Sequence, residues 1–312
     1  MADIVTLTIN PAIDLSVSVE RVTAFNKLRV ANERRDPGGG GINVARVIKR
    51  LGGDVTAMFP AGGALGQLLR RLMDNEGIPA LTTAIAGETR EDFTVLERAT
   101  EAQYRFVLPG PWLAESEWRD CLNIFGAIEQ GARFVVGSGS LPPGVPDDFY
   151  ARVVQAAKQD DRKIVIDTSG LPLQAALSAG IYLVKPNLNE FRLLVRERLE
   201  TEAAQIKACR TLIDKRQAQI VALTRGEQGA LLVARDLVLR AKAMPIKPVS
   251  VVGAGDSFLG AMIWSLARGH PLDLALRYAV AAGSAALLMP GTELGQKKDI
   301  ERLMSDVDVQ SV

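Results

Sequence analysis

The sequence predicts an α/β fold in which a mostly parallel β-sheet is covered by helices on both faces. Two observations indicate this fold. Short runs of apolar and β-branched residues alternate with longer stretches that show the apolar period of a helix. The chain has 312 residues, 47% of them hydrophobic, so it can bury a large core. Ligands of such sheets bind beyond the carboxyl ends of the strands, and most polar motifs of this chain fall there.

The individual elements follow from length and composition. Seven short apolar runs are expected to form strands: 4–9, 55–59, 134–137, 164–167, 182–184, 220–224 and 230–233. Seven longer periodic stretches are expected to form helices: 41–51, 66–76, 147–159, 171–179, 189–195, 201–215 and 256–268, the last of them amphipathic. The uncharged residues 278–292 are too few to cross a membrane, which takes about 20 apolar residues, and predict a buried helix.

Two segments depart from this alternation. Residues 15–35 and 88–108 show the polar–apolar alternation of antiparallel strands. We expect them to form one small sheet that projects from the main domain as a lid and offers a face for a second copy of the chain. Because the sequence contains no long linker and no internal repeat, residues 1–312 are expected to form a single domain.

Composition argues against several classes of function. The net charge is +1, from 37 basic and 36 acidic residues, so no basic excess points to nucleic acid or to a membrane surface. The cysteines, Cys121 and Cys209, form no metal-binding motif and are expected to be buried and reduced, as in a cytoplasmic protein. The single histidine, His270, leaves almost no material for Ser-His-Asp or Cys-His chemistry.

The most informative motif is Gly-Ala-Gly-Asp at 253–256, directly before a predicted helix. Its glycines allow a tight turn whose N–H groups can approach a ligand, and the helix start adds donors and a partial positive charge. Gly253, Ala254 and Gly255 are therefore candidates for a phosphoryl-binding anion hole. Asp256 is a candidate general base for a substrate hydroxyl, with a simple helix N-cap as the alternative.

A second glycine cluster, Gly38-Gly39-Gly40-Gly41, precedes Asn43 at a predicted helix start. Bare backbone N–H groups and the Asn43 amide suit a polyhydroxyl or phosphorylated ligand, whereas a flexible loop is the alternative. The cluster does not match a P-loop, and Phe258 prevents a dinucleotide fingerprint at the other glycine motif. Asp14, just past the first strand, is expected either to accept hydrogen bonds from sugar hydroxyls or to close a turn.

A third motif, Lys-Pro-Asn-Leu-Asn-Glu at 185–190, follows a predicted strand. Lys185 can reach phosphate oxygens from that position. Asn187 and Glu190 are three residues apart at a helix start, so they share a face. Glu190 suits Mg²⁺ on nucleotide phosphates, through a water, and a helix-initiating turn is the alternative.

Two further features are weaker. The turn at 224–230 contains two glycines and is expected to be either a hairpin or a nucleotide loop with Thr224 and Gly226 against phosphate or ribose. The predicted lid carries three basic residues that suit phosphate oxygens, namely Lys27, Arg90 and Arg105. Other basic residues of the lid, Arg29, Arg34 and Arg98, are expected to be solvated.

Taken in order, these motifs resemble those of the PfkB (ribokinase-like) family of sugar kinases. The resemblance covers nearly the whole chain and rests on five segments, 10–14, 37–46, 139–144, 185–190 and 253–256. It implies a ribokinase-like three-layer fold with a small lid sheet. Segments 37–46 and 59–64 carry a closer match to members that phosphorylate fructose 6-phosphate. Members that act on fructose 1-phosphate or tagatose 6-phosphate usually have Lys where this chain has Gly40.

The resemblance also implies roles for individual residues. Asp256 would be the base and Gly253, Ala254 and Gly255 the anion hole. Sugar hydroxyls would contact Asp14, Gly39 and Asn43, and the sugar phosphate would contact Lys27, Arg90, Arg105 and Ser138. The ATP site would be lined by Lys185, Asn187, Thr224, Gly226 and Gly229, with Glu190 supporting Mg²⁺. Backbone carbonyls of Ser250, Val252, Ala286, Met289 and Gly291 would hold K⁺, and Glu293 stands where closer relatives have a basic residue.

The function that the resemblance implies is transfer of the γ-phosphoryl group of MgATP to the 1-hydroxyl of fructose 6-phosphate, giving fructose 1,6-bisphosphate. The expected partners are this sugar phosphate, ATP and a second copy joined through the lid sheet, in the cytoplasm. The nearest alternative is a kinase for tagatose 6-phosphate or fructose 1-phosphate. A non-catalytic sugar-phosphate sensor is a more distant one.

Overall fold

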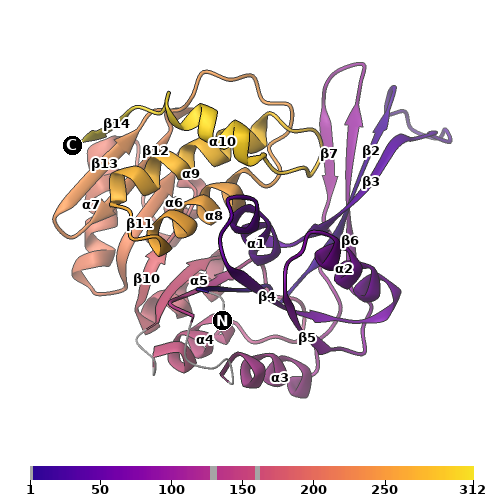
Figure 1. The fold of residues 1–312 in the computed structure, drawn as a ribbon, viewed down its shortest axis with the longest axis horizontal. Helices are drawn as coiled ribbons and strands as arrows, with labels where there is room; N and C mark the ends of the chain where they lie inside the picture. Colours follow the sequence, from indigo (N-terminus) through magenta and orange to yellow (C-terminus); the bar gives the residue numbers. More distant parts are fainter. Residues whose placement is uncertain (1–2, 127–131, 159–161) are drawn as a thin grey trace.

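A computed structural model describes residues 3–126, 132–158 and 162–312. Within these ranges a ten-stranded sheet lies between two layers of helices, with strand order β14-β13-β12-β11-β10-β9-β8-β1-β4-β5 (Figure 1). The parallel strands are β1 (Ile4–Leu7), β4 (Val55–Ala61), β5 (Ala80–Ala84), β8 (Phe134–Ser138), β9 (Lys163–Asp167), β10 (Ile181–Val184) and β11 (Ala218–Thr224). An antiparallel edge is formed by β12 (Ala230–Ala234), β13 (Leu237–Ala241) and β14 (Val309–Ser311).

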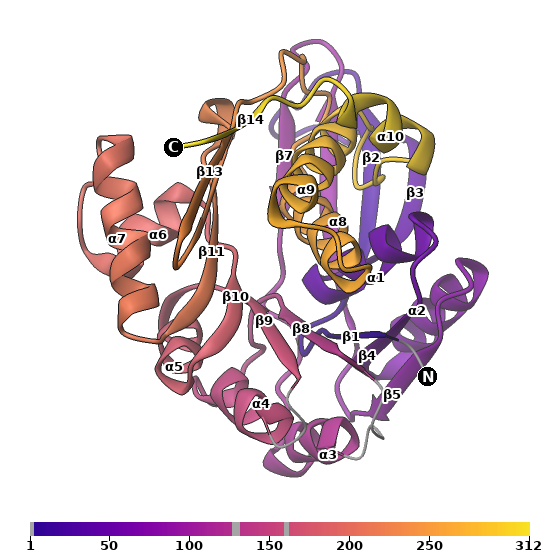
Figure 2. The same cartoon turned by 60° about the vertical axis from the view of Figure 1, so that its left-hand side comes forward.

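Helices cover both faces of the large sheet because its strands are apolar on both sides (Figure 2). In β8, for example, Phe134 and Val136 join one core and Val135 joins the other. The first core is closed by α1 (Gly40–Arg50), α2 (Gly63–Asn75), α8 (Ala254–Ala267), α9 (Leu272–Leu287) and α10 (Lys297–Met304). The second is closed by α3 (Glu115–Gly126), α4 (Phe149–Lys158), α5 (Gly170–Ala179), α6 (Leu188–Val195) and α7 (Glu202–Asp214).

These elements confirm the α/β prediction. All seven predicted strands and all seven predicted helices are present, with shifts at their ends. The predicted helix over 147–159 begins at Phe149, and its predicted last residue lies outside the described residues. The expected amphipathic character of α8 is wrong. Every residue from Ser257 to Ser265 is buried, because α8 packs against α1 and α9 and shares the first core with the large sheet.

Other expectations about the interior are confirmed. The uncharged residues after Arg277 belong mostly to the buried α9. Cys121 and Cys209 are buried free thiols, and burial raises the pKa of Cys121 to about 11. None of the helices in the described ranges is both long enough and apolar enough to span a membrane.

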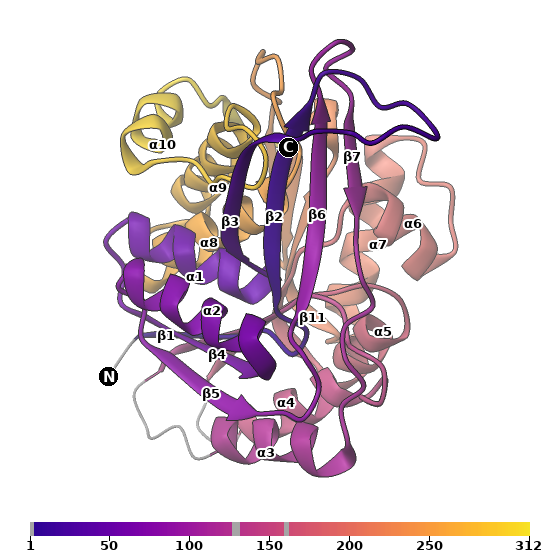
Figure 3. The ribbon, with the colours of Figure 1, turned by 90° about the vertical axis from the view of Figure 1, so that its right-hand side faces the viewer.

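A second sheet of four strands projects from the main body (Figure 3). Its order is β3-β2-β6-β7, with bounds β2 (Ala12–Val19), β3 (Ala31–Gly38), β6 (Arg90–Glu97) and β7 (Gln103–Phe106). The outer pairs are antiparallel as predicted, but β2 and β6 run parallel, with Ala12 opposite Arg90. The prediction is wrong for this central pair because both strands leave the large sheet outward, β2 after β1 and β6 after β5.

Candidate active site

The first turn of α8 presents backbone N–H groups at the carboxyl-end edge of the large sheet. Gly253 caps the helix in the left-handed conformation, with φ 73°. A Cβ on Gly253 would lie 2.6 Å from Leu294 Cδ2, so the turn needs a residue without a side chain. Because the first N–H groups of a helix have no acceptor within the helix, this turn is suited to an anion.

Asp256 lies in that first turn and is held by Asn43. The Asn43 Nδ2 donates to Asp256 Oδ2 at 2.9 Å. Burial raises the pKa of Asp256 above its usual value of 3.8, although the Asn43 hydrogen bond and the charges of Lys185 and Arg105 oppose this. The interpretation of Asp256 as an N-cap is wrong, since Gly253 occupies that position. Asp256 is thus a partly buried carboxylate with a raised pKa, as a general base requires.

Lys185 brings a positive charge to the same turn. Its Nζ lies 3.2 Å from Asp167 Oδ1, and a Cβ built on Gly255 would lie 3.4 Å from that Nζ. Burial raises the pKa of Asp167 to about 6 against the charge of Lys185. Burial alone would lower the pKa of Lys185, but the carboxylates of Asp167, Asp256 and Glu190 outweigh it and raise that pKa, so the ammonium stays charged.

Asp167 carries no role in the sequence prediction. Its signal is a carboxylate at the end of the apolar strand β9, next to the strand that precedes Lys185. Ser138 ends β8 and pairs with Asp167 in the sheet register. The carboxyl ends of β8, β9 and β10 therefore deliver Ser138, Asp167 and Lys185 to one edge.

The glycine cluster of residues 38–41 packs tightly instead of forming the flexible loop of the alternative interpretation. Gly38 ends β3, and α1 begins at Gly40. Gly39 has φ 105°, and its Cβ would lie 2.7 Å from Thr8 Cγ2. A Cβ on Gly40 would lie 2.3 Å from Ser138 Oγ, so only glycine lets α1 start against the end of β8.

Asp14 lies within β2 and not in a turn, so the turn interpretation is wrong. Its carboxylate packs against Gly38, where a Cβ would lie 2.4 Å from Asp14 Cγ. Burial raises the pKa of Asp14 to about 6, and the charge of Arg105 opposes the rise. Because Arg105 lowers the pKa of both Asp14 and Asp256, one cation acts on both carboxylates.

The three predicted phosphate ligands of the lid differ in environment. Arg105 is exposed on β7. Arg90 is largely buried and donates to the carbonyls of Leu108, at 2.6 Å, and Asn10, at 3.1 Å, so it also braces the base of the small sheet. Lys27 is exposed and belongs to the connection between β2 and β3, which Figure 3 shows at the outer end of the small sheet.

The other basic residues of the lid follow the prediction in part. Arg98 forms only an exposed ion pair with Glu20. Arg34 is not merely solvated, because it donates twice to the buried Asp36, at 2.8 and 3.0 Å, and once to Glu293, at 2.8 Å. The expectation for Arg34 is therefore wrong.

The segment after β10 forms a helix-initiating turn, which was the alternative interpretation of the Lys-Pro-Asn-Leu-Asn-Glu motif. Asn187 caps α6, and a capping box joins it to Glu190, with bonds of 2.8 and 2.9 Å. Among the described residues no cluster of three His, Cys, Asp or Glu side chains suits a metal ion.

The turn after β11 is a hairpin that joins β11 to β12. Thr224 at its start pairs with Asn187 and donates its N–H to the Pro186 carbonyl at 3.1 Å. A Cβ on Gly229 would lie 2.1 Å from the Ala241 carbonyl oxygen, whereas Gly226 faces open space. This segment is a hairpin in conformation, and it lies beside the start of α6.

The carbonyl groups predicted for K⁺ lie on two adjacent segments. Ser250 Oγ donates to the Gly291 carbonyl at 2.6 Å, and Val249 N–H donates to the Leu287 carbonyl at 2.7 Å. The Ala286 carbonyl accepts from Met289 N–H at 3.0 Å. Carbonyl oxygens have two lone pairs, so those of Ala286 and Gly291 keep capacity for a cation.

Comparisons with known proteins agree with this geometry. The model of the pfkB family of carbohydrate kinases matches residues 2–299. The ATP-dependent 6-phosphofructokinase isozyme 2 of Mycobacterium tuberculosis is 46% identical over 96% of this chain and 88% of its own length. The isozyme 2 of Escherichia coli K12 is 41% identical over 97% of this chain and 98% of its own. The crystal structure of Escherichia coli phosphofructokinase-2 in complex with potassium has a TM-score of 0.93 at 40% identity, and the match covers 98% of this chain and 99% of that one.

Proposed function

Because the chain belongs to the pfkB family of carbohydrate kinases, we propose that it is an ATP-dependent 6-phosphofructokinase. It transfers the γ-phosphoryl group of MgATP to the 1-hydroxyl of fructose 6-phosphate and releases ADP and fructose 1,6-bisphosphate. The observation that carries this proposal is the partly buried Asp256 in the first turn of α8, held by Asn43 and flanked by Lys185. Two relatives with this activity in their names are 46% and 41% identical.

The transfer needs a base, an anion hole and a cation. Asp256 takes the proton of the 1-hydroxyl while that oxygen attacks the γ-phosphorus, and the bond from the γ-phosphorus to the bridging oxygen of ADP breaks. The N–H groups of Gly253, Ala254 and Gly255 hold the oxygens of the transferring group. Lys185, beside Gly255, offsets the charge that develops on them.

The two substrates approach from opposite sides of Asp256. On the sugar side, Asp14, Gly39 and Asn43 bind hydroxyl groups. The sugar phosphate is bound by Arg105, Arg90 and Ser138, and Lys27 completes its ligands if the lid of a second copy brings it close. On the nucleotide side, the phosphates and ribose of ATP contact Lys185, Asn187, Thr224, Gly226 and Gly229, and Glu190 orients Mg²⁺ through a water.

A potassium ion fits the two segments that lie beside the anion hole. The carbonyl groups of Ser250, Val252, Ala286, Met289 and Gly291 form an all-oxygen donor set, of the kind that binds K⁺ in other proteins. A bound K⁺ would add positive charge next to the first turn of α8. The related Escherichia coli enzyme is the subject of a crystal structure with potassium.

We further propose that residues 1–312 form one kinase domain, with lid strands from about 15–35 and 88–108, that works as a cytoplasmic homodimer. Exposed apolar side chains occur on the small sheet and on the segments at its ends, among them Val30, Tyr104, Phe106 and Val107. Exposed apolar side chains of this kind are available to an interface between subunits. Light scattering of the wild type and of Phe106→Lys tests this proposal, which predicts a dimer that the substitution dissociates.

The test of the activity is ADP release against a panel of sugars. Fructose 6-phosphate, tagatose 6-phosphate, fructose 1-phosphate and unphosphorylated fructose are compared in one coupled assay, with phosphorus NMR of the product and Asp256→Asn as the inactive control. We expect the highest kcat/KM with fructose 6-phosphate. A preference for another phosphate would make the chain a sibling kinase, and no ADP release with any sugar would make it a non-catalytic sensor.

A further inference from the structure

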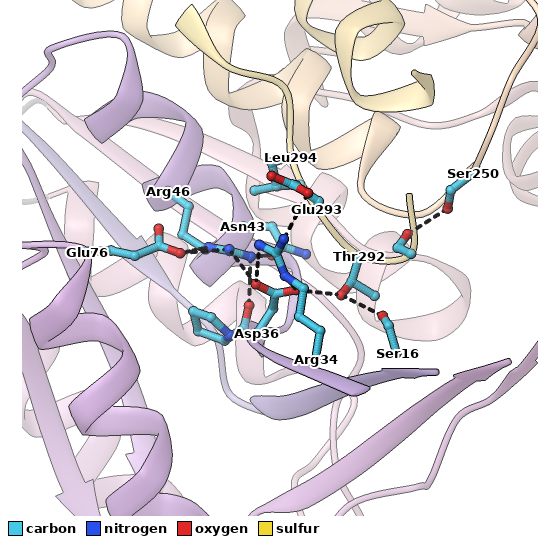
Figure 4. Close-up of polar contacts among 12 residues, drawn as sticks. Ser16, Arg34, Asp36, Asn43, Arg46, Glu76, Ser250, Thr292, Glu293 and Leu294 are labelled. Atoms are coloured by element: carbon cyan, nitrogen blue, oxygen red, sulfur yellow. Dashed lines mark hydrogen bonds and ion pairs between the residues drawn. The ribbon is translucent and has the colours of Figure 1, made fainter. Parts of the chain in front are cut away.

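Arg46 in α1 is the largest fully buried side chain in the described part of the chain. Its Nε donates to Glu76 Oε1 at 2.8 Å. One terminal nitrogen donates to the Pro37 carbonyl at 3.0 Å and to Asn43 Oδ1 at 3.4 Å, and the other donates to Asp36 Oδ1 at 3.3 Å (Figure 4). Every part of the guanidinium therefore has an acceptor, although no atom of Arg46 reaches solvent.

Stability alone does not account for this arrangement. The cost of desolvating a guanidinium and its carboxylates offsets most of their attraction, so such a cluster adds little over apolar packing. The cluster does fix the orientation of the guanidinium, because a planar guanidinium that is held from two sides can donate its remaining N–H groups only in fixed directions. Arg46 is held by Glu76 and Asp36, and one of its terminal nitrogens donates to Asn43 Oδ1.

The side-chain amide of Asn43 lies between a hydrogen-bond donor and a hydrogen-bond acceptor. Its Oδ1 faces the guanidinium of Arg46, which can only donate, and its Nδ2 faces the carboxylate of Asp256, which accepts. Rotation of the amide by half a turn would point NH₂ at the guanidinium and oxygen at the carboxylate. Arg46 therefore selects the one orientation in which Asn43 donates to Asp256.

The frame that holds Arg46 extends to the small sheet and to the segment before α10. Asp36 in β3 accepts two hydrogen bonds from Arg34 and one from Thr292 Oγ1 at 3.0 Å. Thr292 in turn lies 3.1 Å from Ser16 Oγ in β2 (Figure 4). Asp36 is thus held by two other residues, through three hydrogen bonds, in addition to its contact with Arg46.

Resting on the proposed kinase function, we propose that Arg46 is a positioning residue for phosphoryl transfer. It orients the Asn43 amide, and Asn43 holds Asp256 Oδ2 so that the other carboxylate oxygen faces the substrate hydroxyl. Arg46 itself touches neither substrate. The role is one of alignment, so its loss affects turnover more than binding.

The test is Arg46→Lys. Lysine keeps the charge and the stem but has one nitrogen, which pairs with Asp36 and Glu76 and cannot also reach Asn43. We expect kcat to fall at least about tenfold, with the KM for ATP and for fructose 6-phosphate within about threefold of wild type. Arg50→Lys is the matched control, since Arg50 lies one turn later in α1 and donates to the Leu294 carbonyl at 2.5 Å. Its contact with Glu76 is a looser ion pair of 3.9 Å, which lysine can keep. This control should keep kcat within about twofold.

A double-mutant cycle with Asn43→Ala shows whether the effect passes through Asn43. We expect the double variant Asn43→Ala/Arg46→Lys to have the kcat of Asn43→Ala alone. Asp36→Asn gives a second, milder perturbation of the same frame if Arg46→Lys does not fold, and it should show the same non-additivity. Circular dichroism at the assay temperature establishes that each variant is folded.

The outcomes separate the two proposals. Normal kcat in both Arg46→Lys and Asp36→Asn, or losses that multiply with that of Asn43→Ala, would refute the positioning role while the wild type remains a kinase. A wild type that releases no ADP with any sugar phosphate would refute the proposed function instead. A reduced kcat with retained KM and a non-additive cycle would establish the role of Arg46.

Discussion

Asp167 fixes the position of the Lys185 ammonium group. Its Oδ1 lies 3.2 Å from the lysine Nζ, and both side chains are largely buried. A lysine side chain is a flexible stem with a compact charge, so its direction depends on what holds the ammonium. Here the holder is the last residue of β9, which is fixed in the sheet opposite Ser138. The charge of Lys185 is thereby kept beside Gly255.

We predict that Asp167→Asn raises the KM for ATP about tenfold, because the amide still accepts from Lys185 but no longer attracts its charge, a change worth about 1.5 kcal/mol. The KM for fructose 6-phosphate should stay within about twofold. Steady-state kinetics with each substrate varied in turn measures both. Asp148→Asn is the control, because Asp148 forms an exposed ion pair with Arg152. An unchanged KM for ATP would refute the role of Asp167.

We predict that Asp256→Asn lowers kcat at least about a hundredfold, since a general base contributes about 10²–10⁴-fold. The KM values for both substrates should remain within a few-fold, because the anion hole of residues 253–255 is intact. Single-turnover measurements separate the chemical step from product release. Turnover close to that of the wild type would show that another group accepts the proton.

We predict that Arg105→Ala and Arg90→Ala both raise the KM for fructose 6-phosphate far more than the KM for ATP. Only Arg90→Ala should also lower the melting temperature. Arg90 is largely buried and paired with Asp92, and loss of one partner of a buried pair costs about 3–5 kcal/mol. Arg105 is exposed, so its loss leaves no buried charge without a partner. Kinetics combined with thermal unfolding distinguishes the two, and equal losses for both substrates would contradict the sugar-phosphate role.

Much of the fold was predictable because its signals are local. Apolar, β-branched runs such as that of β9 are buried on both faces and stand out in the sequence. Three strands of the large sheet, β5, β13 and β14, were missed. Strand β5 has one buried residue, β13 has five residues with Arg240 among them, and β14 has only three residues. The parallel pairing of β2 and β6 depends on where both strands leave the large sheet, which no local pattern encodes.

Some residues of the candidate site were likewise predictable from local signals, and others are brought together only by the fold. Gly253 and Asp256 belong to one short motif, so their proximity followed from the sequence. The bond between Asn43 and Asp256 joins residues 213 positions apart, and it exists only because α1 and α8 pack side by side. Arg46 looks like any basic residue of a helix in the sequence, and only its complete burial marks it.

We predict that Gly40→Ala raises the KM for fructose 6-phosphate about tenfold and leaves the KM for ATP unchanged. The new Cβ would lie 2.3 Å from Ser138 Oγ and 3.0 Å from the Gly139 nitrogen, so the Ser138 hydroxyl must turn away. Gly126→Ala is the control, because its Cβ meets nothing within 4 Å. In the Ser138→Ala background the same substitution should add little, and a full additional loss there would place the effect elsewhere.

The last prediction concerns stability and its dependence on pH. Burial raises the pKa of Asp14 from 3.8 to about 6, so the native state binds its proton more tightly than the unfolded state. The contribution of Asp14 to the free energy of unfolding is therefore greatest below about pH 4, and this contribution is lost as the pH rises through about 6. The difference between 3.8 and about 6 corresponds to about 3 kcal/mol when Asp14 is ionised.

Asp14→Asn removes that ionisation and keeps the shape of the side chain. We expect the variant to melt at a higher temperature than the wild type at pH 8, and the difference to disappear at pH 4, where Asp14 is neutral in the wild type. The KM for fructose 6-phosphate should rise, since an amide replaces the carboxylate that accepts from the sugar hydroxyls. Asp54→Asn, at an exposed position, is the control and should leave both quantities unchanged. A melting difference equal at both pH values would show that ionisation of Asp14 does not cause it. A variant less stable than the wild type at pH 8 would show that the Asp14 carboxylate stabilises the fold, which its burial against Gly38 argues against.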